Sequence, residues 1–424
     1  MKKTIYKLFQ IYILCNVIAL CIIHPKSYAQ QDIKATLDKY IEKFIKEQNI
    51  PGAAVAIVHN KDVFFTKTWG ITGESEKKIT SKTPFAIGSI SKSLTALAIV
   101  KLIEEKKIKL EDSVQQHLPW FKLKDSQISS SITIQHLLTH TSGINTYEGL
   151  LISDKQSKSS TALKENVMRL SNVKLTALPG EKYQYSNANY IVLGALIEEI
   201  TNDTYSSYME KHVFQLLNMN GASASKETAI DLYLSPLYNI NSEKSYGFGL
   251  RTTSINESET MIWHSGSTPD ARAEIFTLNN SGWGGVILTN KNHVLEEPAL
   301  SVLKKGIINI LNEEEPVDPH KSIPFTQIVM CTVILALFIS SIMLIKKYKH
   351  KKTVKKLTWL FIGNLFLLLS IIFIPLLTYS TSSPWRTIKI FAADVGLLTS
   401  IIVILLAVNG LLSIFIGIRR YKDK

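Results

Sequence analysis

Apolar residues recur along the chain with two different periods, which predict where helices and strands lie. Residues 33–45 carry apolar positions at helical spacing, whereas residues 52–70 have the pattern of two strands joined by a turn. Four short runs between 246 and 290 predict consecutive antiparallel strands, and residues 298–311 predict a closing helix. Patterns typical of helices or loops fill about 110–240. We therefore expect an α/β domain, in which helices flank an antiparallel sheet and a mostly helical subdomain is inserted.

Three long apolar segments close the chain, and each could cross a hydrocarbon layer about 30 Å thick. They are residues 325–345, 357–377 and 391–418. The connection between the first two is densely basic, and so is the tail at 419–424. Positively charged flanks favour the cytoplasmic side, so three transmembrane helices within 325–418 would leave residues 30–323 outside the cell membrane. Residues 313–324 are acidic and carry three prolines, which predicts a flexible linker between domain and membrane.

The first 29 residues have the features of an export signal. A lysine-bearing start precedes an apolar stretch, and Ser27 and Ala29 occupy the small-residue positions before a cleavage site. An uncleaved signal anchor is the alternative interpretation. The cysteines Cys15, Cys21 and Cys331 all lie in apolar segments. We therefore expect an exported domain without disulfides or thiol chemistry.

The net charge of +13 invites a nucleic-acid partner, but its distribution argues against one. Residues 1–29 and 324–424 together carry +15, so residues 30–323 are close to −2. The positive charge belongs to the segments that flank the predicted membrane spans. We expect a membrane protein that binds no nucleic acid.

The first candidate for chemistry is the stretch "SISK", in which Ser89 and Lys92 lie three residues apart at the head of an apolar helix. Residues i and i+3 share a helix face, so the Lys92 amine can reach the Ser89 oxygen. Burial would lower the pKa of that amine until it accepts a proton. Ser-x-x-Lys also occurs elsewhere in this chain, and a helix cap beside a surface lysine is the alternative.

Two further stretches place polar side chains next to apolar segments. "YSN" brings Tyr185 and Asn187 to the start of an apolar helix, where a phenol could move a proton and an amide could hold a substrate carbonyl. "HSGS" brings His264, Gly266 and Ser267 to a strand, and the glycine would let a ligand approach the strand edge. Taken alone, each stretch is better explained as a simple turn.

Together, the three stretches resemble the motifs of the serine penicillin-recognising superfamily, particularly its class C β-lactamase-like branch. This superfamily includes the low-molecular-weight penicillin-binding proteins. The stretch "ITIQHLLTHTSGI" at 132–144 also looks typical of that branch. The resemblance covers most of residues 33–312. It implies a β-lactamase/transpeptidase-like fold within residues 30–312.

The resemblance also implies roles for individual residues. Ser89 would be the nucleophile of an acyl-transfer reaction and Lys92 its base. Tyr185 would be a second base or proton donor, and Asn187 would position the substrate. The backbone N–H groups of Ser89 and Ser267 would form the oxyanion hole.

Two departures from the family pattern bear on activity. His264 stands where the family usually has lysine, and a largely neutral imidazole holds a substrate carboxylate less firmly than an ammonium. This favours ester or amide substrates over strong β-lactam hydrolysis. The segment between Met219 and Tyr246 is shorter than the corresponding segment in the class C-like branch, which predicts a reduced cleft wall.

The combination of export signal, hydrolase-like domain and three spans looks like two known groups of enzymes. One comprises cell-envelope penicillin-binding-like proteins, including D-alanyl esterases and carboxypeptidases. The other comprises membrane-bound D-aminopeptidase-type enzymes that activate nonribosomal-peptide prodrugs. Ala86, three residues before Ser89, offers no carboxylate for a free D-residue amine, which favours the envelope group. A non-catalytic membrane-bound sensor is the third possibility.

The expected substrate is a small molecule, a peptide or a cell-envelope polymer, and the sequence does not define an oligomeric state. His136, His140 and His264 lack carboxylate or thiolate partners at ligand spacing. We therefore expect neither a metal nor another cofactor.

Overall fold

The computed structural model describes residues 33–73, 75–153, 159, 161–215, 232–295, 297–318, 324–349 and 355–419. The predicted signal peptide therefore lies outside the described residues. So do residues 319–323 of the predicted linker, most of the predicted tail, and residues 219–231 of the stretch expected to form a shortened cleft wall.

Within the described residues, eight strands form one antiparallel sheet in the order β2-β1-β8-β7-β6-β5-β4-β3. The strands are β1 (Gly52–His59), β2 (Asp62–Gly70), β3 (Tyr238–Asn239), β4 (Lys244–Gly247), β5 (Leu250–Ser254), β6 (Thr260–Ser267), β7 (Arg272–Leu278) and β8 (Trp283–Thr289). Pairing of β1 with β8 joins the N-terminal hairpin to the C-terminal strands. The predicted antiparallel sheet is confirmed.

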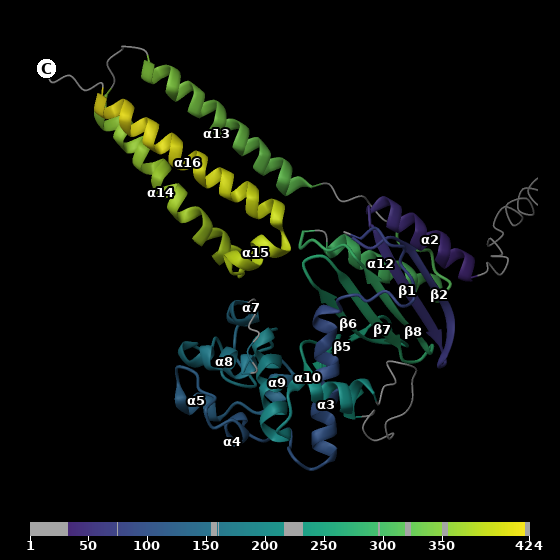
Figure 1. The fold of residues 1–424 in the computed structure, drawn as a ribbon. Coiled ribbons are helices and arrows are strands. Elements are labelled where there is room, and N and C mark those ends of the chain that lie inside the picture. The colour runs from purple at the N-terminus through teal and green to yellow at the C-terminus, as the bar shows by residue number, and fades with distance from the viewer. Residues whose placement is uncertain are drawn as a thin grey trace, which may run out of the picture.

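Two helices from opposite ends of this domain pack together with the sheet, α2 (Ile33–Glu47) and α12 (Glu297–Leu311) (Figure 1). The two helices and the sheet share a single apolar core. Every second residue of a strand and every third or fourth residue of a helix lie on the same face, so the apolar side chains of each element point to the core. Its members include Leu37, Ile41, Phe44, Ile57, Phe276, Ile287 and Ile307. Gly306 of α12 allows the ring of Tyr40 to pack directly against the helix backbone.

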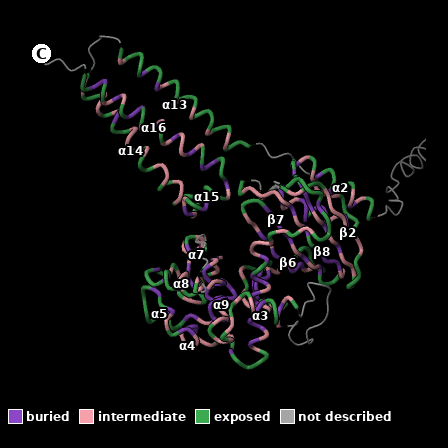
Figure 2. Tube along the Cα trace, viewed as in Figure 1, coloured by how far each residue is buried: buried purple, intermediate pink, exposed green. Residues whose placement is uncertain are grey.

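The chain between the two parts of the sheet is mostly helical, as predicted. Its elements are η1 (Gly88–Ile90), α3 (Ser91–Glu104), α4 (Val114–His117), α5 (Ser126–Ser130), α6 (Ile134–Leu138), α7 (Thr146–Ser153), α8 (Ala162–Met168), η2 (Arg169–Asn172), α9 (Asn187–Thr201), α10 (Tyr205–Met209) and η3 (Glu210–Phe214). Helices α3 and α9 are largely buried (Figure 2) and contact each other in a second apolar core. Both begin at motifs singled out in the sequence, so their packing brings those motifs together.

Three helices near the C-terminus are long and apolar enough to cross a membrane: α13 (Phe325–Lys349), α14 (Lys356–Thr381) and α16 (Ala393–Arg419). The short helix α15 (Trp385–Phe391) precedes α16. Few residues of α13 and α14 are buried in the structure (Figure 2), as expected of helices that face lipid. Asn409 of α16 donates to Ser341 of α13 at 2.8 Å, a polar contact between two of these helices.

The hydrolase-like part touches this bundle through the segment after β8. His293 is hydrogen-bonded to Asp394, in the first turn of α16, at 2.8 Å. The backbone N–H of Val294 donates to the carbonyl of Phe391 at 3.3 Å. This segment also approaches β6, because Asn292 Nδ2 donates to the Thr268 carbonyl at 2.7 Å.

The contact between α2 and α12 generates a stability prediction. A Cβ at Gly306 would lie 1.9 Å from the Tyr40 hydroxyl, which is held by the carbonyl of Val317. Gly306→Ala should therefore lower the free energy of unfolding by about 1–3 kcal/mol. Gly73→Ala is the control, because a Cβ there meets nothing within 4 Å. Thermal unfolding of the full chain in detergent, followed by tryptophan fluorescence, checks this. Equal stability of the two variants would contradict it.

Candidate active site

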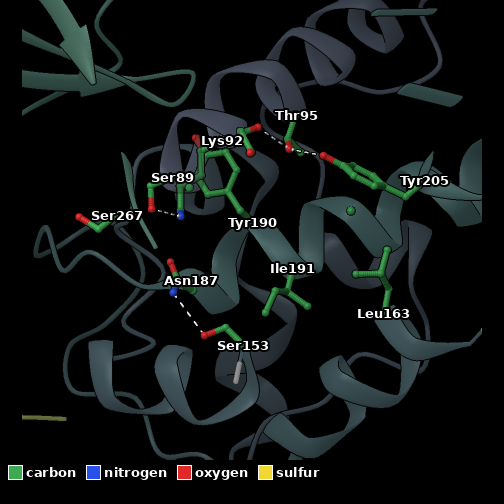
Figure 3. Close-up of a pocket in the computed structure, with 13 residues that line it drawn as sticks. Ser89, Lys92, Thr95, Ser153, Leu163, Asn187, Tyr190, Ile191, Tyr205 and Ser267 are labelled. Atoms are coloured by element: carbon green, nitrogen blue, oxygen red, sulfur yellow. Dashed lines mark hydrogen bonds between the residues drawn. The ribbon is translucent and has the colours of Figure 1, made fainter. Parts of the chain in front are cut away.

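Ser89 and Lys92 face each other at the junction of η1 and α3. Ser89 is the second residue of the 3₁₀ turn, and Lys92 is the second residue of the helix that follows directly. Continuity of the two elements keeps the i and i+3 side chains on one face. Lys92 Nζ and Ser89 Oγ are hydrogen-bonded at 3.0 Å (Figure 3).

The surroundings of Lys92 disfavour its charged form. The residue is only 8% exposed, and its Nζ lies 5.0 Å from the centre of the Tyr185 ring and 5.8 Å from that of Tyr190. In the described part of the chain, no carboxylate forms an ion pair with this amine. Burial lowers the pKa of Lys92 to about 7. Near neutral pH, a large fraction of this lysine can therefore accept a proton.

Tyr185 and Asn187 reach the same place from the start of α9. Ser186 is the N-cap residue of that helix, and its extended backbone turns the two flanking side chains toward Ser89 and Lys92. Burial raises the pKa of Tyr185 to about 12, and its hydrogen bond with Ser89 opposes this rise. The Tyr185 phenol is therefore protonated at neutral pH. Asn187 Nδ2 donates to Ser153 Oγ at 3.3 Å, while its buried Oδ1 has no hydrogen-bond partner among the described atoms.

The edge of β6 approaches η1 closely because two glycines meet there. Gly88 has φ +52°, in the left-handed region, and a Cβ on it would lie 2.7 Å from the Ser267 backbone nitrogen. A Cβ on Gly266 would lie 1.8 Å from the Ile87 carbonyl oxygen and 3.2 Å from the Ser89 nitrogen. Any side chain at either position would separate the two segments. The backbone nitrogens of Ser89 and Ser267 consequently lie on adjoining segments beside the Ser89 hydroxyl.

His264 belongs to a buried hydrogen-bonded chain. His140 Nδ1 accepts from the Ser186 backbone N–H at 3.2 Å, so its Nε2 carries the proton and faces the Tyr246 hydroxyl at 3.3 Å. That hydroxyl lies 3.3 Å from His264 Nε2, and His264 Nδ1 donates to the Ser265 carbonyl at 2.6 Å. Burial lowers the pKa of His264 to about 3 and that of His140 well below its usual value. Both rings are neutral at pH 7.

Ser267 is tied to a buried ionic cluster behind the sheet edge. Its hydroxyl donates to Glu297 at 2.5 Å and accepts from Arg272 at 3.0 Å. Arg272 also pairs with Glu274 at 2.8 Å, and Glu274 accepts from Lys304 at 2.8 Å. Two cations and two carboxylates balance here, which is what permits them to be buried. The cluster holds the end of β6 against α12.

A cavity of about 340 Å³ opens beside Ser89 (Figure 3). Its described lining comprises Gly88, Ser89, Ser91, Lys92, Thr95, Ser153, Leu163, Asn187, Tyr190, Ile191, Gly194, Tyr205 and Ser267. Four of the residues singled out in the sequence are in this set. Tyr185 contacts Ser89, and Gly266 lies behind the cavity wall. The predicted substrate-binding residue His264 is not among the lining residues, since its ring points into the buried chain.

Sequence reasoning assigned no role to several residues that shape this site. Arg251 of β5 is one, because its guanidinium lies 5.7 Å from the centre of the Tyr185 ring and its charge lowers the pKa of His264. Tyr246 is another, since it bridges the two histidines. The family-like stretch at 132–144 contained a signal for His140, but the positions of Arg251 and Tyr246 depend on strand pairing. In the part of the chain that the structure describes, no group of three or more potential metal ligands occurs.

Comparison with known proteins agrees with this geometry. Residues 37–244 match the family model for beta-lactamase. Protein flp of Staphylococcus aureus strain N315 is 30% identical over 255 residues, which cover 59% of this chain and 48% of that protein. Esterase EstB of Burkholderia gladioli is 30% identical over 198 residues, covering 44% of this chain and 50% of EstB. The chain thus spans about half the length of the curated relatives it matches.

Two solved structures share the fold. The octameric penicillin-binding protein homologue from Pyrococcus abyssi has a TM-score of 0.57 at 24% identity, covering 68% of this chain and 79% of that one. SurE, solved with D-Leu, has a TM-score of 0.54 at 16% identity, covering 69% and 78%. The sheet and the helical insertion agree with the family match, so the domain that contains residues 37–244 belongs to the serine β-lactamase and penicillin-binding-protein superfamily of hydrolases.

Proposed function

We propose that this protein is a membrane-anchored serine hydrolase that works through an acyl-Ser89 intermediate outside the cytoplasmic membrane. The observation that carries the proposal is the 3.0 Å contact between Ser89 Oγ and the buried Lys92 amine, whose pKa burial lowers to about 7. An amine that is partly neutral at physiological pH can act as a general base, whereas an ordinary surface lysine cannot.

In the acylation step, Ser89 Oγ attacks the carbonyl carbon of an ester or amide while its proton passes to Lys92 Nζ. The negative charge that develops on the carbonyl oxygen would be stabilised by the backbone N–H groups of Ser89 and Ser267. The carbon–oxygen or carbon–nitrogen bond to the leaving group then breaks. The leaving group takes a proton from Tyr185, which is protonated at neutral pH, and Lys92 returns a proton to the phenol.

In the deacylation step, a water molecule attacks the acyl-serine carbonyl and gives its proton to Lys92 or, through it, to Ser89 Oγ. The free acid and the original serine result, so atoms and charge balance over the cycle. The Oδ1 of Asn187, which has no hydrogen-bond partner among the described atoms, would accept a hydrogen bond from a substrate N–H and fix the orientation of the scissile group.

We propose D-amino-acid-containing amides or esters of the cell envelope as the substrates. The family relationship and the similarity to an esterase support hydrolysis of such bonds. SurE, which shares the fold, was solved with D-Leu. Because His264 is neutral and turned away from the cavity, a strong site for a β-lactam carboxylate is not expected there.

Covalent labelling tests the nucleophile. The full chain in detergent should react with a fluorescent acyl-phosphonate, and Ser89→Ala should lose the label completely because no other hydroxyl contacts Lys92 among the described residues. Ser130→Ala is the control, since Ser130 is an exposed serine at the end of α5 that does not line the cavity, and it should keep its labelling rate within about twofold. A chain that folds but takes no Ser89-dependent label would instead be a membrane-bound sensor.

The pKa of Lys92 sets a pH dependence. The neutral amine is the reactive form, so its fraction and the acylation rate should rise about tenfold per pH unit below 7 and level off above it. Lys92→Met should slow acylation by about 10²–10⁴ without unfolding the chain. Lys101→Met, on the same helix but paired with Glu105, should change nothing. A rate that keeps rising between about pH 8 and 10 would remove Lys92 as the base.

The proposed topology can be tested with single cysteines. Ser206→Cys, on α10, should react with a membrane-impermeant maleimide in intact cells, because the hydrolase domain would lie outside. Lys355→Cys, at the basic start of α14, should react only after permeabilisation. Labelling of the unsubstituted chain provides the background from Cys331. The reverse pattern of labelling would place the active site in the cytoplasm.

A further inference from the structure

The cavity beside Ser89 continues as a groove between α3 and α9. On α3 it is lined by Ser91, Lys92 and Thr95, and on α9 by residues at positions i, i+3, i+4 and i+7, from Asn187 to Gly194. These spacings define one continuous face of each helix. At 1.5 Å per residue, the lining residues span about 6 Å of α3 and about 10 Å of α9.

Polarity changes along this groove (Figure 3). Close to Ser89 the lining is polar, with Ser267 and Asn187, and Ser153 contacts Asn187. The Tyr190 ring lies beside Lys92, and further along the lining consists of Ile191, Leu163, Gly194 and the Tyr205 side chain. Lys92 is the one lysine, arginine, aspartate or glutamate among the described lining residues. The distal part therefore offers no countercharge to an ionic group.

Gly194 is what keeps the distal part open. It lies in the interior of α9, where glycine costs about 1 kcal/mol relative to alanine. A Cβ at this position would lie 3.3 Å from Leu163 Cδ1 and 3.6 Å from Tyr205 Cδ2. Any larger side chain would project into the space between these residues. The helix thus carries an unfavourable residue at the point where a side chain would close the groove.

The far end of the groove is closed by two hydroxyls that satisfy each other. Thr95 Oγ1 donates to the Ser91 carbonyl at 3.0 Å and therefore accepts from the Tyr205 hydroxyl at 2.7 Å. Because both hydroxyls are hydrogen-bonded, the groove is faced mainly by the methyl group of Thr95 and the ring of Tyr205. A substrate that reaches this end therefore needs no polar group there.

We propose that the groove binds an uncharged, apolar chain attached to the carbonyl carbon that Ser89 attacks. The substrate class is thus an ester or amide whose acyl part extends well beyond a methyl group. This inference rests on the proposed acyl-serine chemistry and narrows the class of substrates. A cavity of about 340 Å³ is far larger than an alanyl side chain requires. The chain could be a linear acyl group or the side chain of a large apolar D-residue.

Chain-length dependence tests the proposal on the full chain in detergent. We expect kcat/KM for p-nitrophenyl hexanoate to exceed that for the acetate by about ten- to a hundredfold. A parallel comparison of D-leucyl and D-alanyl p-nitroanilides tests whether the apolar chain is a linear acyl group or the side chain of a D-residue. A preference confined to the esters identifies a linear acyl group, and a preference confined to the anilides identifies a D-residue side chain.

Two substitutions should change the preference in opposite directions. Gly194→Val fills the groove and should reduce the hexanoate-to-acetate ratio to below about threefold. Leu163→Ala widens it and should raise the rate for octanoate relative to hexanoate several-fold. Leu175→Ala is the matched control, because Leu175 is also half-buried against the same apolar core but does not line the cavity. It should leave both ratios unchanged.

The outcomes separate this inference from the proposed function. Ser89-dependent hydrolysis without any chain-length preference, or with a preference that survives both Gly194→Val and Leu163→Ala, would overturn the groove assignment and leave the serine chemistry intact. Absence of Ser89-dependent hydrolysis of every ester and anilide would overturn both. If Gly194→Val fails to fold, Leu163→Ala alone decides, since truncation of a half-buried leucine leaves the helix backbone unaltered.

Discussion

The burial of one amine against one hydroxyl is the constraint on which the site depends. Lys92 is enclosed by the Tyr185 and Tyr190 rings, and burial lowers its pKa to about 7. A carboxylate beside it would favour the charged form and remove the base. The balanced ionic cluster around Arg272 holds Ser267, at the end of β6, without an ion pair between any of its carboxylates and Lys92.

The fold produces this arrangement by joining three distant stretches of sequence. The turn η1 supplies the nucleophile and α3 its base, the residue before the N-cap of α9 supplies the phenol, and β6 supplies the facing backbone. Gly88 and Gly266 allow β6 and η1 to approach closely. The buried chain from His140 through Tyr246 to His264 then links the helical part to the sheet. Neutral rings make this link without placing further charge near the amine.

Much of this architecture could be predicted because it follows from local pattern. Strand alternation and helical periodicity located the sheet and its flanking helices, and the i and i+3 spacing was sufficient to pair Ser89 with Lys92. Tertiary packing decided the rest. His264 was expected to contact substrate, yet its ring faces Tyr246, because strand pairing places that hydroxyl beside it. The groove at Gly194 likewise depends on Leu163 and Tyr205, whose proximity no sequence spacing encodes.

The most direct test of the central claim is to titrate Lys92 itself. With ¹³C at the ε-position of every lysine, the NMR signal that Lys92→Met removes can be followed through a pH series in detergent. We predict a midpoint near pH 7, set by burial of the amine. A midpoint at about 10.4, as for an exposed lysine, would show a permanently charged side chain and contradict general-base catalysis by Lys92.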